Sequence, residues 1–473
     1  MIEINDVKDK YTRNIRAEKL NMVNPVVRHV GQGTIRIAIH GYCRFNHMSY
    51  GAIILRSEEN PVNSHLVCKR LRRSKYFSDI FEFTNLSPGR YTYQAGMFML
   101  PKSAHRFDQT SDYIDFVDAH EATVTLLDDD TAIFRFGMGS CRFFLNIFST
   151  SIGLKKSDKS YRTMDRMDRI QAFMMLGDSV YMDIVKWLPY VRVMDRLEMF
   201  KVHRRAMSTP GFKNLFSRIP YYPIPDDHEY RDDANPLQEH IEPSTYNNAR
   251  EAINTFVNIN GPLPMNSRVP IWAEFVQAGI PFFAADTRYE RDDFRGKIMS
   301  NKQMNRLKKA LSAPRDPNIP FFIMSAAPFA LQTKNNDTWA GYKKQQESLI
   351  RYIHRKKIKN VFFLTGDSHC SMCARFRIYD KDDNYVDNDI VEIMSSGLYQ
   401  LARDSRKNFN MVHKMNEYKL IARDKNESTF RSRIVRRNNF AEVKVDKVKC
   451  EVKVDIRTSS GVRKISWRFP LSS

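Results

Sequence analysis

The sequence predicts a layered α+β protein with a small β-sandwich domain near its N-terminus. In residues 26–127, short segments alternate apolar and polar side chains with the period of two that strands show. From about residue 128, short apolar segments alternate with longer helical stretches, a rhythm typical of sheets covered by helices. These patterns divide the chain into an N-terminal extension (1–25), a sandwich domain (26–127) and a larger domain (128–473).

The sandwich domain is predicted from strands that flank a turn. Thr34–His40 alternates with period two, and Phe81–Thr84 is a second strand-like segment. Asn85–Arg90 contains a Pro-Gly pair that suits a tight turn, and Tyr91–Ala95 resumes the alternation. No group of residues in this domain suggests catalysis.

The larger domain is predicted to contain buried strands. Six segments are short, apolar and strand-like: Thr131–Phe136, Phe173–Leu176, Pro220–Ile224, Pro281–Ala285, Phe321–Ser325 and Val361–Thr365. Tyr342–Arg355 has helical periodicity, with Leu349, Ile350 and Ile353 on its inner face. Alternation from Phe440 to Phe469 predicts late antiparallel strands.

Five of these strands run directly into polar turns. The turns are Gly137–Arg142, Gly177–Tyr181, Pro225–Glu229, Asp286–Arg288 and Gly366–His369. Sites in open α/β sheets form beyond the strand ends. If the turns share one edge, they gather Cys141, Asp178, Tyr181, Asp227, His228, Asp367 and His369. Carboxylates that close together repel one another unless cations lie between them, so the pattern predicts a pair of metal ions.

The ligand types indicate which metals would bind. A thiolate, a phenolate and an imidazole suit iron or zinc, whereas a mostly carboxylate half suits calcium, magnesium or manganese. Taken singly, each residue has a simpler interpretation. An Asp after a strand often caps a turn, a lone Cys141 is often a small buried hydrophobe, and Tyr181 could line the core edge. Cys370 and Cys373 form a bare C-x-x-C without a second pair, which does not predict a separate zinc or redox site.

The order of the motifs resembles one known family. The motifs are Ser140-Cys141, Gly-Asp-x-x-Tyr at 177–181, Asp-Asp-His-Glu at 226–229, Asp-Thr-Arg at 286–288, Trp-x-Gly-Tyr at 339–342 and Gly-Asp-x-His at 366–369. In them the chain is similar to the alkaline phosphatase D (PhoD-like) phosphatases and phosphodiesterases of the calcineurin-like metallophosphoesterase superfamily. The resemblance covers most of the chain. It implies a four-layer α/β/β/α sandwich with a fibronectin-like N-terminal β-sandwich domain.

The resemblance also implies roles for individual residues. Iron (Fe³⁺) would be bound by Cys141, Asp178, Tyr181 and His369. One or two calcium ions would lie near Asp178, Asp227 and Asp367, with Asp178 bridging, and other divalent metals could replace them. His228 would contact the phosphoryl oxygen or protonate the leaving group. Apart from the resemblance, we expect that an in-line attack of hydroxide on phosphorus would leave the metals, His228 and Arg142 to stabilise the equatorial oxygens. A further oxygen ligand is expected from Asn248, Glu251 or Asn254, of which we take Asn254. Asp226, Asp286 and Arg288 are expected to support these ligands from outside.

The chain departs from the family pattern in three places. Its N-terminus carries acidic residues and no apolar export leader, so we expect a cytoplasmic protein, or an exported one if a leader has been removed. Pro225 stands where an aromatic residue often precedes Asp-Asp-His-Glu. The basic stretch Arg403–Arg437 falls where the family has a variable capping segment.

Six cysteines without a secretory signal are expected to be free thiols.

The charge of the chain leaves the substrate open. Its formal net charge is +21, and residues 401–473 hold 19 Lys and Arg against 8 Asp and Glu. Such an excess attracts polyanions, although it could equally be a solvated surface. We therefore predict a metal-dependent phosphoester hydrolase that uses a metal-activated hydroxide. The alternatives are a nuclease-like phosphodiesterase acting on nucleic acid, and a non-catalytic binding or effector module on the same scaffold. Monoester or diester preference and oligomeric state stay open.

Overall fold

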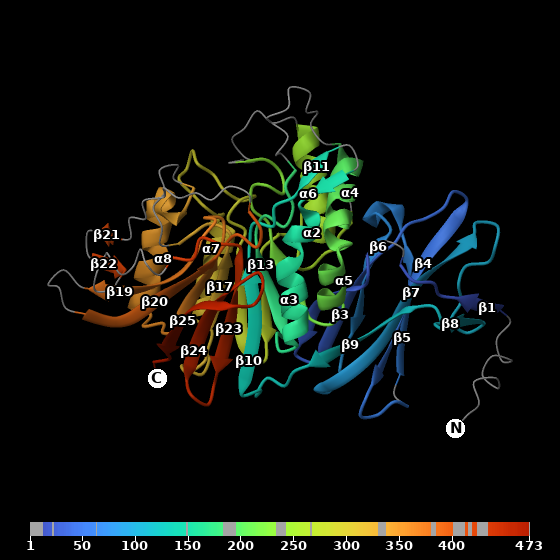
Figure 1. Cartoon of the computed structure of the whole chain (residues 1–473), viewed down its shortest axis with the longest axis horizontal. Helices are drawn as coiled ribbons and strands as arrows, with labels where there is room; N and C mark the ends of the chain where they lie inside the picture. The colour runs from blue at the N-terminus through green and yellow to red at the C-terminus, as the bar shows by residue number, and fades with distance from the viewer. Residues whose placement is uncertain are drawn as a thin grey trace.

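The structure is a computed structural model of the 473-residue chain (Figure 1). It describes residues 13–20, 23–62, 64–147, 150–182, 195–232, 243–264, 267–329, 337–379, 385–400, 412–414, 419–422 and 434–472. Most of the predicted basic stretch 403–437 and of the N-terminal extension 1–25 lies outside these residues. Among the described residues, no helix is both long and apolar enough to cross a membrane.

The N-terminal part consists of strands and lies at one end of the molecule, drawn in blue in Figure 1. A three-stranded sheet has the order β2 (Val26–Gly31), β3 (Thr34–His40), β6 (Ser78–Phe83). A four-stranded sheet has the order β5 (Ser64–Leu71), β4 (His47–Ser57), β7 (Gly89–Pro101), β9 (His120–Leu126). Smaller elements are the pair β1 (Arg13–Arg16) and β8 (Asp112–Asp115), and the 3₁₀ turn η1 (Arg73–Lys75). Apolar residues of both sheets, among them Ile37, Ile53 and Tyr93, form one buried cluster. The predicted turn lies between β6 and β7.

A six-stranded sheet occupies the centre. Its order is β14 (Tyr221–Ile224), β13 (Ala172–Leu176), β10 (Ile133–Gly139), β23 (Asn439–Asp446), β24 (Glu451–Thr458), β25 (Arg463–Pro470). The first three strands are parallel, whereas β23, β24 and β25 are antiparallel neighbours, as the late alternation predicted.

An eight-stranded sheet packs beside it. Its order is β15 (Ala273–Gln277), β16 (Ile280–Ala284), β17 (Phe321–Ser325), β18 (Val361–Thr365), β20 (Tyr385–Ser395), β19 (Ser371–Tyr379), β22 (Lys419–Ala422), β21 (Val412–Lys414). Strands β16, β17, β18 and β20 are parallel to one another. A short hairpin, β11 (Leu145–Ile147) and β12 (Thr150–Ile152), stands apart from both sheets.

Burial on both faces explains the unbroken apolar runs of the central strands. One cluster joins alternate residues of the two sheets, and the rings of Phe136 and Phe322 meet in it at 5.3 Å. The other residues of β13, such as Phe173, pack against one set of helices. That set is α3 (Lys159–Met167), α4 (Arg196–Met207), α5 (Pro210–Phe216) and α6 (Pro243–Phe256), with the short α2 (Leu154–Ser157) beside it.

Alternate residues of the eight-stranded sheet pack against a second set of helices. Phe283, Ile323 and Phe363 are clustered with α7 (Asn301–Leu311), η3 (Trp339–Tyr342) and α8 (Lys343–Arg355). Figure 1 shows α7 and α8 on the far side of the strands from α3 and α5. The fold is therefore mixed α/β, which confirms the predicted class at that level.

The predicted strands and the predicted helix are present with small shifts at their ends. Tyr342–Arg355 is α8 from Lys343, with the preceding turn in η3. The polar turns do come together, which was the condition for the predicted ligand residues to meet, but they do not belong to one sheet. They follow strands of both sheets, and meet because the two sheets pack together with those ends side by side. All six cysteines are free, as expected.

Candidate metal centre

The turns after the parallel strands are hydrogen-bonded to one another. The Cys141 amide donates to Gly177 O at 3.3 Å, which links the turns after β10 and β13. The Asp367 amide donates to Ser140 Oγ at 3.2 Å, which links the eight-stranded sheet to the six-stranded sheet. Backbone and hydroxyl contacts therefore hold the predicted ligand turns together.

Two glycines allow this close approach. A Cβ atom on Gly177 would lie 2.5 Å from Asp226 Cβ, and the φ of Gly177 is +91°. A Cβ atom on Gly366 would lie 2.4 Å from Leu176 O. Glycine at both positions lets the ends of three strands meet without a clash.

Four of the predicted ligand residues have a left-handed backbone. Their φ angles are +56° at Cys141, +54° at Asp178, +59° at Asp367 and +52° at His369. This region is unfavourable for residues other than glycine and persists where the surrounding structure imposes it. Its recurrence at the ends of three strands indicates that the turns are shaped to present these side chains.

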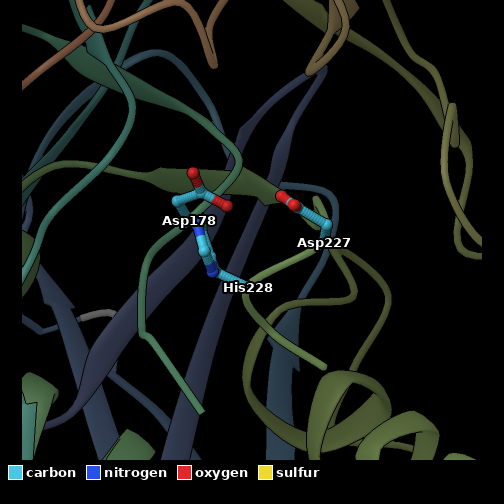
Figure 2. A group of neighbouring side chains, drawn as sticks. All are labelled: Asp178, Asp227 and His228. Atoms are coloured by element: carbon cyan, nitrogen blue, oxygen red, sulfur yellow. The ribbon is translucent and has the colours of Figure 1, made fainter. Parts of the chain in front are cut away.

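Two groups of carboxylates meet at Asp178. Asp178, Asp227 and His228 have ligand atoms within 4.8 Å of one another, and so do Asp178, Asp226 and Asp367. Figure 2 shows the carboxylate of Asp227 pointing toward Asp178, with the imidazole of His228 next to Asp178. Asp178 therefore belongs to both groups.

A thiol and a phenol contact the same carboxylate oxygen. Cys141 Sγ lies 3.3 Å, and the Tyr181 hydroxyl 3.4 Å, from Asp178 Oδ2. Ser396 Oγ lies 3.1 Å from Cys141 Sγ and accepts a hydrogen bond from the His369 amide at 2.8 Å. The structure thus places Cys141 and Tyr181 in direct contact with Asp178. Ser396 connects Cys141 to the backbone of His369.

Burial changes the protonation of these groups. It raises the pKa of Asp178 well above its usual range, and repulsion from Cys141 and Asp227 adds to the effect. Burial also raises the pKa of Asp226, against the opposing influence of Arg288. The pKa of the Cys141 thiol is raised to about 11, and that of Tyr181 well above its usual value, again mainly by burial.

These groups fit a metal site. Asp178 Oδ1 and Asp226 Oδ2 are buried and have no hydrogen-bond partner among the described residues. A buried carboxylate oxygen without a partner is unfavourable, and a cation between the carboxylates would remove both the repulsion and the missing contact. The donor set combines carboxylate oxygens with a thiol, a phenol and an imidazole, which suits more than one kind of metal.

A buried glutamate fixes two of the turns. Glu229 accepts hydrogen bonds from the Ser179 amide at 2.5 Å and the Ser179 hydroxyl at 2.7 Å. It also accepts from the Asp178 amide at 3.1 Å and the Asp226 amide at 2.9 Å. Its carboxylate therefore positions Asp178 and Asp226 relative to each other.

Arg288 and Asp286 surround the cluster as supporting groups. Arg288 Nη2 lies 2.8 Å from both Asp226 Oδ1 and Asp337 Oδ2, and 4.0 Å from Asp227 Oδ1. Asp286 accepts from the amides of Arg288 at 3.0 Å and Tyr289 at 2.7 Å, which shapes the turn that carries Arg288. Burial raises the pKa of Asp286 to about 6.

His228 lies at the edge of the cluster. Its side chain is 17% exposed, and Nε2 is 3.9 Å from Asp232 Oδ1. Its ring lies 4.2 Å from the ring of Tyr181. A substrate could therefore approach this imidazole from solvent.

The side chains of two predicted site residues point elsewhere. The Arg142 guanidinium is buried and donates to Ala206 O at 2.8 Å and to Thr209 Oγ1 at 2.9 Å, between α4 and α5. Asn254 Nδ2 donates to Ser267 O at 3.2 Å, and its Oδ1 accepts from Asn258 at 3.4 Å. The alternative Glu251 accepts from the Tyr76 hydroxyl at 2.6 Å. Roles for Arg142 and Asn254 stay predictions, and these contacts favour packing roles.

The structure adds residues that the sequence did not indicate. Ser396 contacts Cys141, Gln400 contacts Tyr181, and Asp337 pairs with Arg288. Ser396 follows β20, which was not among the predicted strands, so no polar turn was expected there. Gln400 and Asp337 carry no such signal either.

Known proteins are similar to this chain in sequence and in fold. A family model described as PhoD-like phosphatase matches residues 155–455, more than half of the chain. The solved structure of PhoD is similar over 94% of this chain and 90% of its own, with a TM-score of 0.67 and 14% sequence identity. At that identity the likeness concerns the fold. A solved β-glucuronidase of Parabacteroides merdae covers 94% of this chain and 77% of its own at 8% identity, but its TM-score of 0.25 carries no argument. None of the curated proteins compared with the chain matches it.

The family model covers the strands β13, β14 and β16 to β18, together with the turns that follow them. Those turns hold the carboxylates of Asp178, Asp226, Asp227 and Asp367. The resemblance inferred from the motifs is therefore confirmed. The chain is a phosphoric ester hydrolase that belongs to the PhoD-like phosphatase family.

Proposed function

We propose that the chain hydrolyses phosphodiesters or phosphomonoesters at a multinuclear metal site centred on Asp178. One observation carries the proposal. Asp178 is shared by two groups of potential ligands, Asp227 with His228 and Asp226 with Asp367. A carboxylate shared in this way suits a bridge between two ions.

The ligand types suggest how the ions would be divided. Iron would be held by Cys141, Asp178, Tyr181 and His369, because thiolate, phenolate and imidazole suit a transition metal. One or two calcium ions would be held by Asp178, Asp227 and Asp367, with other divalent ions as alternatives. Asp226 faces the same space through its buried Oδ2, and we add it to the candidates. Bound metals would supply a nucleophile from water at neutral pH and offset charge on the phosphoryl oxygens.

The residues of the chain would then orient the substrate. His228 would meet a phosphoryl oxygen or a leaving group that enters from solvent, because it is partly exposed and a ring nitrogen lies within 4.8 Å of carboxylate oxygens of Asp178 and Asp227. Arg288 would keep Asp226 and Asp227 in place through its ion pairs. We leave Arg142 out of the catalytic residues, because its Nη1 and Nη2 donors are bonded within the helix layer.

The finer description of the fold belongs to the same proposal. Residues 128–473 would form four successive layers: one set of helices, the six-stranded sheet, the eight-stranded sheet and a second set of helices. This order suits a four-layer α/β/β/α metallophosphoesterase sandwich. The sheets before residue 127 suit a separate fibronectin-like sandwich domain. Both layers of helices would keep the strand ends rigid around the metal site.

Elemental analysis and kinetics together test the proposal. We expect the purified wild-type chain to contain close to one transition metal per molecule, and Cys141→Ser and His369→Ala to lose it. On an aryl phosphodiester and the matching monoester, Asp178→Asn and His228→Ala should each lose about 100-fold or more in kcat. Losses of only a few-fold in both variants, or no bound metal after reconstitution with iron and calcium, would overturn the proposal. Asn214→Ala, on the surface of α5, is a control that should change neither readout.

A further inference from the structure

A cavity of about 520 Å³ lies away from the carboxylates, between the N-terminal sheet and the central sheet. Its wall combines Thr123 and Thr125 of β9 with Arg135 of β10 and the residues that precede β13 and β14. These are the starting ends of the parallel strands, whereas the metal-site turns follow their other ends. Arg135 and Cys141 are separated by six residues of extended chain, which corresponds to about 20 Å. The cavity is therefore distinct from the proposed metal site.

Arginines dominate the charge of the cavity. Four of them, Arg90, Arg135, Arg169 and Arg218, line it together with a single carboxylate, that of Asp168. Guanidinium groups in such a hollow attract anions wherever carboxylates do not fully balance their charge.

The carboxylates around the cavity are divided unevenly among the arginines. Arg218 pairs with Asp165 and, at 3.0 Å, with Asp168, so its charge is balanced. Glu442 lies 2.8 Å from Arg169, 2.6 Å from Arg457 and 3.7 Å from Arg135, so one carboxylate serves three guanidinium groups. Arg90 is 3.4 Å from Glu58 at the exposed surface, where an ion pair contributes little. Arg135 and Arg90 are thus only weakly neutralised.

We propose that this cavity binds a small anion that carries two or more phosphate groups. A guanidinium group presents parallel N–H donors that match phosphate oxygens, and several arginines around one hollow can contact more than one phosphate. The side chains of Thr123 and Thr125 add hydroxyl donors to the same wall. The volume lies in the range of about 300–1,000 Å³ that small-molecule sites occupy. The carboxylate cluster would not share this ligand in the absence of metal, since its charge repels anions.

Calorimetric titration of the full-length chain with imidodiphosphate, which resists hydrolysis, tests the proposal. The titrations use the Asp178→Asn protein, so that the metal site contributes as little as possible. We expect saturable binding in the millimolar range or tighter. Arg90→Ala/Arg169→Ala should weaken it by about tenfold or more, because two charge-assisted contacts are lost. Arg295→Ala/Arg468→Ala removes the same charge from exposed surface pairs and should leave the affinity unchanged.

Three outcomes would overturn the proposal. They are no saturable binding, equal weakening by the cavity and control variants, and undiminished binding in the cavity variant. Removing Arg169 also breaks its hydrogen bonds to Glu442, which could disturb the fold around the cavity. The single variants Arg90→Ala and Arg90→Lys, which keep Arg169, are therefore titrated as well. Thermal unfolding checks that each variant remains folded. Loss in Arg90→Ala with partial retention in Arg90→Lys is expected for a phosphate contact. Because no metal is required, failure here leaves the proposed hydrolase function untouched.

Discussion

Gln400 donates a hydrogen bond from Nε2 to the phenolic oxygen of Tyr181 over 2.6 Å. Its own backbone amide donates to Asn438 Oδ1 at 3.1 Å, which anchors Gln400 to the start of β23. The same phenol lies 3.4 Å from Asp178 Oδ2. Gln400 therefore holds Tyr181 in the orientation that a ligand of the proposed iron site would need.

The first prediction concerns this bond. In Gln400→Leu, the Tyr181 oxygen loses a donor and becomes a stronger electron donor to iron. We expect the absorption band from tyrosinate to iron to move to longer wavelength, while the iron content stays close to that of the wild type. Tyr181→Phe is the control that should abolish the band. An unchanged band in Gln400→Leu, with the band still lost in Tyr181→Phe, would contradict the role of Gln400.

The second prediction concerns stability without metal. Burial and neighbouring carboxylates raise the pKa of Asp178, so its charged form is unfavourable in the folded state. The contribution of protonated Asp178 to the free energy of unfolding is therefore complete at pH values below the pKa of this group in the unfolded chain. It is lost as the pH rises through the pKa of Asp178 in the folded chain. At pH 7 in a chelator, Asp178→Asn should therefore raise the free energy of unfolding by about 1–3 kcal/mol.

Asp337 provides the opposite case on the same network. Its ion pairs with Arg288 and Arg291 hold its pKa well below the usual range, against the effect of burial. The contribution of ionised Asp337 to the free energy of unfolding is present at pH values above the pKa of this group in the unfolded chain. It is lost as the pH falls through the pKa of Asp337 in the folded chain. Asp337→Asn should lower the free energy of unfolding by about 3 kcal/mol at pH 7. Chemical denaturation measures both variants, and a shift of the same sign in the two would refute this account.

The third prediction is that metal affinity increases with pH. The Cys141 thiol, with its pKa raised to about 11, is protonated at neutral pH and must lose its proton to bind a metal. The apparent affinity should rise about tenfold per pH unit between pH 6 and 8 for each proton displaced. Competition with a chelator at several pH values measures this slope. A slope of zero in the wild type would show that the ligands are already deprotonated.

Local pattern was enough to predict the ligand turns. The central strands are buried on both faces, so segments such as Phe173–Leu176 and Val361–Thr365 are almost entirely apolar and easily recognised. Each of these segments ends at a polar turn. The sequence therefore predicted both the strands and the carboxylates of Asp178 and Asp367, which follow them directly.

Contacts between distant segments could not be predicted in this way. Ser396 and Gln400 reach Cys141 and Tyr181 across more than 200 residues, because β20 lies beside β18. Arg142 was expected to help stabilise the phosphoryl oxygens of the substrate. Its guanidinium instead bonds Ala206 and Thr209, whose position depends on how α4 and α5 pack. The direction of a side chain depends on partners that local sequence does not specify.

The last prediction separates steric clash from backbone strain at the turns. Gly177 has a φ of +91°, and a Cβ atom there would lie 2.5 Å from Asp226 Cβ. Gly296 also has a positive φ, +58°, but a Cβ atom there would have nothing within 4 Å. Gly296→Ala should therefore lose about 1–2 kcal/mol of stability from backbone strain alone and keep its metal content.

Gly177→Ala adds the displacement of Asp226 to a comparable strain. It should lose more stability than Gly296→Ala, by about 1–3 kcal/mol, and should also bind less metal, because Asp226 and Asp178 can no longer keep their spacing. Chemical denaturation and elemental analysis of the two variants, side by side, make the comparison. If Gly177→Ala lost no more stability than Gly296→Ala and kept its full metal content, the close approach of the two turns would not be what positions the carboxylates.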